Sequence, residues 1–225
     1  MRRPATDPYL LPDGLPRPRF RGLLHLGAFV VALGLGVALM LVAGRHDMPA
    51  FAVYALGVAG LFGVSALYHR GRWRPGVRAR LRRADHSMIF VLIAATYTPI
   101  CVYVLGGALG SALLAVVWSG ALMAVALELR PTPAPRAALV GLSIALGWVA
   151  LPALPAVVDE LGWVATALIG VGGVLYTVGA VIYARRRPDP LPEVFGYHEI
   201  FHALTIGGAA SHYAVIAFWV LPLVR

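Results

Sequence analysis

The chain has 225 residues, of which 60% are hydrophobic and only 13% are charged. That charge content is about half that of an ordinary soluble domain, and apolar runs of about 18 or more residues recur along the chain, which excludes a soluble globular protein. The net charge of +9 would suit a nucleic-acid-binding protein, but the positions of the arginines favour a membrane-topology signal and no nucleic-acid partner. A single cysteine, Cys101, excludes an intrachain disulfide and a cysteine-rich metal cluster, and we expect it to be a small core residue.

Hydrophobic runs predict an all-α membrane protein, a bundle of seven transmembrane helices in one domain at 22–225. About twenty polar residues come before it as the segment 1–21, a longer leader than a plain signal peptide has. The fifth run has the least regular pattern, because Pro152 and Pro155 break its end. In chain order, the predicted helices cover 22–44, 49–69, 85–105, 108–129, 137–156, 162–184 and 197–222.

The arginines orient this bundle. All except Arg45 and Arg225 fall in four segments that seven spans place on one side of the membrane. Positively charged loops stay in the cytoplasm, so we expect a cytoplasmic N-terminus and an outer C-terminus. The four segments carry Arg2, Arg3, Arg17, Arg19 and Arg21; then Arg70, Arg72, Arg74, Arg78, Arg80, Arg82 and Arg83; then Arg130 and Arg136; then Arg185, Arg186 and Arg187.

Polar side chains occur where three of these spans meet the arginine-rich side. The second span ends in "SALYHR", with Ser65 one turn before His69. The third begins "DHSMIF", which puts Asp85 in its first turn, and the seventh begins "HEIFH", with His198 and His202. Ionisable residues within a membrane span are costly and usually functional. The predicted topology therefore brings these residues to the same depth.

The spacing of these residues favours a metal site. His198 and His202 are four residues apart and share one face of a helix. His69 would be a third ligand, and three ligands with one open position are typical of catalytic zinc, which lowers the pKa of a bound water and so supplies a nucleophile. Asp85 would hold that water or take its proton, although it could instead be a favourable charge at a helix N-terminus. Ser65 would orient water, ligand or substrate, or only serve helix packing.

Other polar residues have simpler interpretations. His25 and His46 are expected to be interfacial histidines at helix ends, and Glu128 an interfacial acid. His86 points about 100° away from its neighbour Asp85 on a helix, so packing or support of the site is expected rather than ligation. His212 lies about 15 Å beyond His202 and should bond within the bundle.

The sequence H-E-x-x-H is also the zinc signature of metalloproteases, with Glu199 as general base. An intramembrane protease needs a further ligand, and none of the residues after His202 is Asp or Glu, although an upstream ligand would serve. We therefore interpret "HEIFH" as H-x-x-x-H with an incidental Glu199, and keep the protease as a third possible function.

Three motifs, "SALYH", "DHSMIFVLIAATYTPI" and "HEIFHALTIGGAASHY", resemble the hemolysin III proteins of bacteria, which belong with the adiponectin and progestin receptors. The resemblance implies a seven-helix bundle in the bacterial cytoplasmic membrane, with Zn²⁺ near the cytoplasmic face. It assigns the zinc ligands to His69, His198 and His202, a water-mediated contact to Asp85, and the motif serine to Ser65.

The family also suggests what this site acts on. Adiponectin receptors are linked to ceramide amide hydrolysis, so we expect a zinc-dependent hydrolase of a lipid amide or ester, with a membrane lipid as partner. The alternative is a receptor or membrane-stress regulator in which zinc is structural. Hormone signalling is not carried over, because the long cytoplasmic domain of adiponectin receptors is absent. The substrate and the oligomeric state are not indicated.

Overall fold

A computed structural model describes residues 18–130, 132 and 134–225 of the chain. Most of the predicted segment 1–21, with Arg2, Arg3 and Arg17, lies outside the described residues. The described part is all-helical and contains no β-sheet, which confirms the all-α part of the predicted fold class. Its α-helices are α1 (Leu23–Val42), α2 (Met48–Arg70), α3 (Pro75–Pro99), α4 (Gly107–Leu129), α5 (Arg136–Gly147), α6 (Leu154–Arg185) and α7 (Tyr197–Val215).

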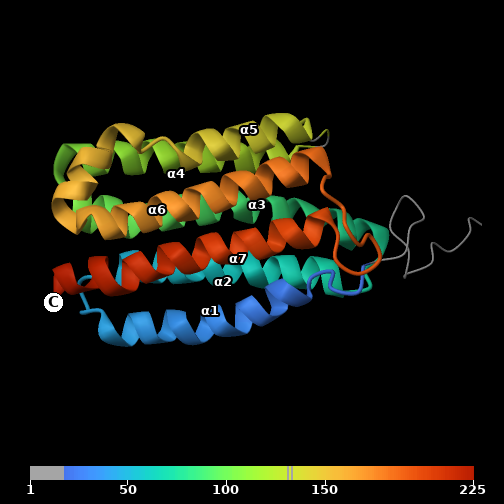
Figure 1. Cartoon of the computed structure of the whole chain (residues 1–225), viewed down its shortest axis with the longest axis horizontal. Helices are drawn as coiled ribbons and strands as arrows, with labels where there is room; N and C mark the ends of the chain where they lie inside the picture. Colours follow the sequence, from blue (N-terminus) through green and yellow to red (C-terminus); the bar gives the residue numbers. More distant parts are fainter. Residues whose placement is uncertain (1–17, 131, 133) are drawn as a thin grey trace, which may run out of the picture.

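Short irregular turns extend or join these helices: π-helical Ile100–Leu105 and Ile216–Val220, and 3₁₀-helical Leu151–Ala153 and Leu221–Val224. Cys101 is buried in the first of these turns, as expected for a small core residue. All the α-helices run roughly along one direction and form an elongated bundle (Figure 1).

Six helical stretches of the described residues are long and apolar enough to cross a membrane, whereas seven are predicted. The fifth and sixth predicted spans fall in one stretch, Arg136–Arg185. Within it α5 has 12 residues and so measures about 18 Å, less than the roughly 30 Å hydrocarbon core of a bilayer. The 3₁₀ turn that contains Pro152 follows, and the chain reverses so that α5 and α6 lie side by side (Figure 1).

Helix α3 begins at Pro75, ten residues before the predicted span. Hydropathy detects only the apolar part of a helix, but this one starts earlier, with Pro75 in its first turn where proline is favoured. Asp85 therefore lies in the third turn of α3. The prediction that it lies in the first turn, and with it the interpretation of Asp85 as a charge at a helix N-terminus, is wrong.

Helix α2 lies at the centre of the bundle and α1 at its margin. Of the most apolar window of each helix, 61% is buried in α2 and only 17% in α1. Phe51 and Tyr54 of α2 are almost completely buried, among side chains of the other helices. The C-terminal end of this central helix, which carries His69, is therefore surrounded by its neighbours.

Candidate metal centre

The predicted ligands come together at the end of the bundle opposite the C-terminus (Figure 1). His69 is in the last turn of α2, and His198 and His202 are in the first two turns of α7. At the start of helix α7 the Gly196 N–H donates to Oε2 of Glu199 at 3.0 Å, so a side chain of the first turn caps the helix. This cap fixes the start of the helix and places His198 immediately inside it.

The three imidazoles lie close enough together that they could hold one metal ion. Nε2 of His69 lies 3.2 Å from Nε2 of His198, and the candidate ligand atoms of all three residues lie within 4.8 Å of one another. Two nitrogens that bind one tetrahedral zinc are about 3.3 Å apart, given zinc–nitrogen distances of about 2.0–2.1 Å. His69 and His202 are buried and His198 is partly buried, so the cluster is shielded from water. The donor set therefore fits zinc or another ion that prefers imidazole.

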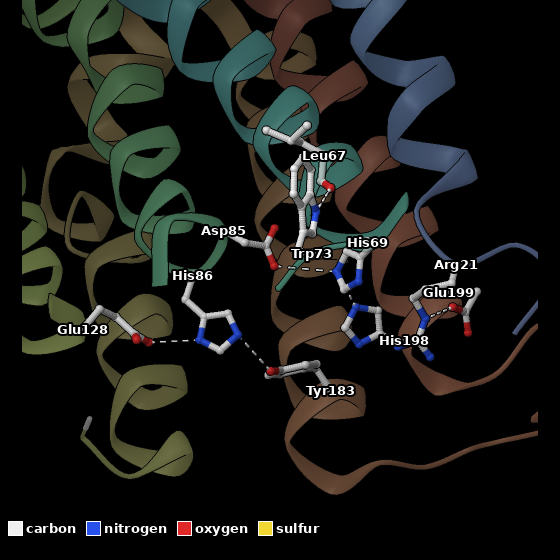
Figure 2. A network of polar contacts seen from close by, with 10 residues as sticks. All are labelled: Arg21, Leu67, His69, Trp73, Asp85, His86, Glu128, Tyr183, His198 and Glu199. Carbon is white, nitrogen blue, oxygen red and sulfur yellow. Dashed lines mark hydrogen bonds and ion pairs between the residues drawn. The ribbon is translucent and has the colours of Figure 1, made fainter. Parts of the chain in front are cut away.

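Asp85 faces this cluster without joining it (Figure 2). Its Oδ2 lies 3.6 Å from Nε2 of His69, too far for a direct hydrogen bond. Ser65 hydrogen-bonds the Asp85 carboxylate, so the serine contacts the acid and not only its own helix. Both residues thus lie beside the three histidines, as the sequence predicts.

His25 also belongs to this site, which sequence analysis missed. It was expected to be interfacial, but it is 3% exposed and stacks on His202, with ring centroids 3.7 Å apart and an interplanar angle of 8°. The sequence did contain an indication of this role, because His25 lies one turn into the first predicted span, at the same arginine-rich end as the other histidines. His46, by contrast, is exposed in the loop before α2, as expected.

A second polar cluster lies beside Asp85. Glu128 of α4, predicted to be interfacial, is instead only 2% exposed, and its Oε1 lies 3.1 Å from Nδ1 of His86. Nε2 of His86 is 3.5 Å from the hydroxyl of Tyr183 on α6 (Figure 2). His86 therefore has the supporting rather than ligating position that was expected. Its partners were missed because nothing local in the sequence links residues on three different helices.

Glu199 turns away from the histidines. Nε of Arg21 donates to its Oε1 at 2.5 Å (Figure 2). Its Oε2 accepts from the Gly196 N–H, so both carboxylate oxygens are engaged. The side chain is completely buried. Glu199 is thus not incidental to the fold, although it lacks the free carboxylate that a metalloprotease base requires. His212 lies deeper in α7 and its ring nitrogen bonds the carbonyl of Ile169, as expected.

A cavity of about 320 Å³ connects the histidine cluster with the interior of the bundle. His198, His202, Asp85 and Ser65 line it at one end, and Trp148 and His212 line it farther along. Most of the remaining wall is aliphatic or aromatic and includes Ile89, Phe90, Leu92, Ile93, Leu139, Val140 and Ile144. An apolar cavity with a few convergent polar groups is typical of a ligand-binding site.

Comparison with known proteins identifies the family. A family model described as haemolysin-III related matches residues 14–213, which include every residue of the candidate site. The chain belongs to the haemolysin-III-related family. It is 32% identical to hemolysin-3 of Bacillus cereus over 190 residues, which cover 83% of this chain and 84% of that protein. It is 28% identical to a hemolysin-3 homolog of Bacillus subtilis (strain 168) over 173 residues, or 77% and 78% of the two chains.

Membership confirms the resemblance recognised in the sequence motifs. Together with the apolar helices it identifies an integral membrane protein of the haemolysin III type. The names of these relatives specify neither a metal nor a reaction.

Proposed function

We propose that this protein is a zinc-dependent hydrolase of a lipid amide or ester, with its site near the cytoplasmic face of the membrane. The observation that carries the proposal is the apolar cavity that ends on His198, His202 and Asp85. An acyl chain suits the aliphatic part of the cavity, and a carbonyl at the end of that chain would lie against the histidine cluster. A purely structural metal would need no such space beside it.

Each side chain of the site has a different role in the proposed reaction. His69, His198 and His202 would hold the ion, which when bound supplies a Lewis acid and an activated water. Asp85 accepts a proton from the attacking water and later gives it to the departing nitrogen or oxygen. The water oxygen joins the acyl carbon, the carbon–nitrogen or carbon–oxygen bond breaks, and the leaving group departs with the transferred proton. Ser65 holds the Asp85 carboxylate toward the cluster through its hydrogen bond.

We further propose that α5 counts as a span, so that seven helices cross a bacterial cytoplasmic membrane with the N-terminus inside. Arginines at the starts of α3 and α5 and at the end of α6 support this orientation, because they gather at the end of the bundle that holds the cluster. Cysteine labelling tests it, since Cys101 is buried. A cysteine at exposed Arg186 should react only from the cytoplasmic side, and one at exposed His46 only from outside. The reverse pattern would overturn the orientation.

One observation favours a second function, a receptor or membrane-stress regulator with a structural zinc. Asp85 lies close enough to His69 that a small movement would make it a fourth ligand, and closed four-ligand sites are structural. The cavity would then hold a lipid ligand that is bound but not cleaved. The two functions differ in whether Asp85 is needed for turnover.

Turnover by the purified full chain in lipid nanodiscs separates these functions. The wild type should hydrolyse members of a panel of lipid amides and esters, and Asp85→Ala should keep its zinc but lose about 100-fold or more in rate, as expected for a general acid–base residue. Asp47→Ala, in the loop at the opposite end of the bundle, is the matched control and should behave as wild type. Bound zinc without any hydrolysis by the wild type would favour the structural role.

A further inference from the structure

The cavity has a second polar wall that the proposed chemistry does not use. His86 and Glu128 line it together with Asp85 and Tyr183. The Glu128 side chain is 3% exposed, whereas that of His86 is 26% exposed, so the acid is enclosed and the imidazole is accessible. Figure 2 shows His86 between Glu128 and Tyr183, on the other side of Asp85 from the histidine cluster.

The partners of His86 determine which ring nitrogen carries the hydrogen. A carboxylate only accepts hydrogen bonds, so the 3.1 Å contact with Glu128 requires a hydrogen on Nδ1. In the neutral ring Nε2 then keeps a lone pair. Nε2 lies 3.5 Å from the hydroxyl of Tyr183, which is at the outer limit for a hydrogen bond. Nε2 is therefore an acceptor that a better-placed donor on a ligand can engage.

The Nε2 acceptor of His86 lies next to the histidine cluster. The ring of Tyr183 contacts both sites, with its centroid 5.7 Å from that of His198 and 6.5 Å from that of His86. A ligand whose carbonyl lies at the cluster has its acyl chain along the apolar wall. The polar wall of His86 and Tyr183 is then left for the other side of the scissile bond, the leaving group.

We propose that Nε2 of His86 accepts a hydrogen bond from an N–H on the leaving-group side of the substrate, and that Glu128 is the positioning residue that fixes the required tautomer. The site accordingly selects secondary amides over ligands that lack this hydrogen. The inference rests on the proposed function for the placement of the carbonyl, but it concerns binding and does not require turnover.

Binding of two matched ligands tests the inference. The probes are a radiolabelled long-chain fatty amide of a small primary amine and its N-methyl counterpart, which lacks only the N–H. Binding is measured on the full chain in nanodiscs, in an Asp85→Asn background that prevents turnover. The secondary amide should bind about tenfold more tightly than the N-methyl amide. The N-methyl amide leaves the Nε2 acceptor of His86 without a hydrogen-bond partner, which costs about the free energy of one hydrogen bond.

Three variants show whether His86 is the cause. In the double variant His86→Phe, Glu128→Leu the ratio of the two dissociation constants, N-methyl amide over secondary amide, should fall to near one. Both residues are replaced together because removing only His86 would leave the Glu128 charge buried and unpaired. Glu128→Gln should give an intermediate ratio, because a neutral amide orients the ring less strongly than a carboxylate. Thr96→Val is the control: Thr96 lines the same cavity from α3, but its hydroxyl bonds the carbonyl of Leu92, so the ratio should not change.

The outcomes separate this inference from the proposed function. A tenfold preference for the secondary amide that persists in the double variant overturns the role of His86, and so does equal binding of both ligands by the Asp85→Asn protein with His86 and Glu128 intact. If the predicted ratios are found but the wild type hydrolyses neither ligand, the hydrolase is wrong and the amide-selective binding site stands.

Discussion

Arg21 and Glu199, 178 residues apart in the chain, form a partly buried ion pair in which Nε lies 2.5 Å from Oε1. Beside this pair, the backbone N–H groups of Arg19 and Phe20 donate to the carbonyls of Glu193 and Val194. The segment before α1 is thereby tied to the loop before α7. This connection holds the start of α7, and with it His198, against the rest of the bundle.

Glu199→Gln should destabilise the protein without reducing metal binding at the three histidines. The change removes the charge that pairs with Arg21 but keeps a side chain that can accept from Gly196, so we expect a loss of about 1–3 kcal/mol in the free energy of unfolding. Thermal unfolding and zinc content of the purified protein measure the two effects. Glu193→Gln, at an exposed position of the same loop, should change neither. Loss of a peptide-cleaving activity in Glu199→Gln would restore the metalloprotease interpretation.

His202→Ala should abolish metal binding. The variant leaves two imidazoles, and we expect zinc content to fall from about one ion per chain toward zero, because a catalytic zinc site needs three protein ligands. His212→Gln is the matched control, since His212 lies on the same helix but bonds Ile169 instead of the cluster. Elemental analysis after dialysis measures the zinc content of both variants. Equal zinc content in the two variants would contradict the three-histidine site.

The stacked ring of His25 should support the site by packing rather than by ligation. His25→Ala would leave a gap against His202, which we expect to cost about 2 kcal/mol of stability and, by loosening that ligand, about tenfold in zinc affinity. His25→Phe keeps a flat ring on His202 and should retain most of both. If the phenylalanine variant binds zinc as poorly as the alanine variant, a ring nitrogen of His25 takes part in the site.

Filling the cavity should separate lipid binding from metal binding. Ala180 of α6 lines the cavity, and Ala180→Phe should weaken lipid binding about tenfold or more, because a close-packed interior cannot accommodate both side chain and ligand. Val178→Phe adds the same ring to an exposed position of the same helix and is the matched control. Native mass spectrometry reports bound lipid, and zinc content should stay constant. Unchanged lipid binding in Ala180→Phe would place the lipid elsewhere.

Much of the architecture follows from local sequence patterns. Apolar runs predict helices because a helix within a bilayer must satisfy its own backbone hydrogen bonds. The spacing of His198 and His202 places them on one helical face. The arginine pattern predicts that His69 and Asp85 lie at the same end of the bundle, and their side chains are 3.6 Å apart. Boundaries were less well predicted: α3 extends into the arginine-rich segment, since a helix need not end where its hydrophobicity ends.

Sequence alone determined which residues gather at one end of the helical bundle and which share a helix face. Only the tertiary structure decided which faces meet. The stacking of His25 on His202, the pairing of His86 with Glu128 and that of Arg21 with Glu199 all join different parts of the chain. Such pairs depend on how helices rotate and pack against one another, and that is set by the fit of many side chains at once. The cavity beside the histidines has the same origin, because it is the space that this packing leaves unfilled.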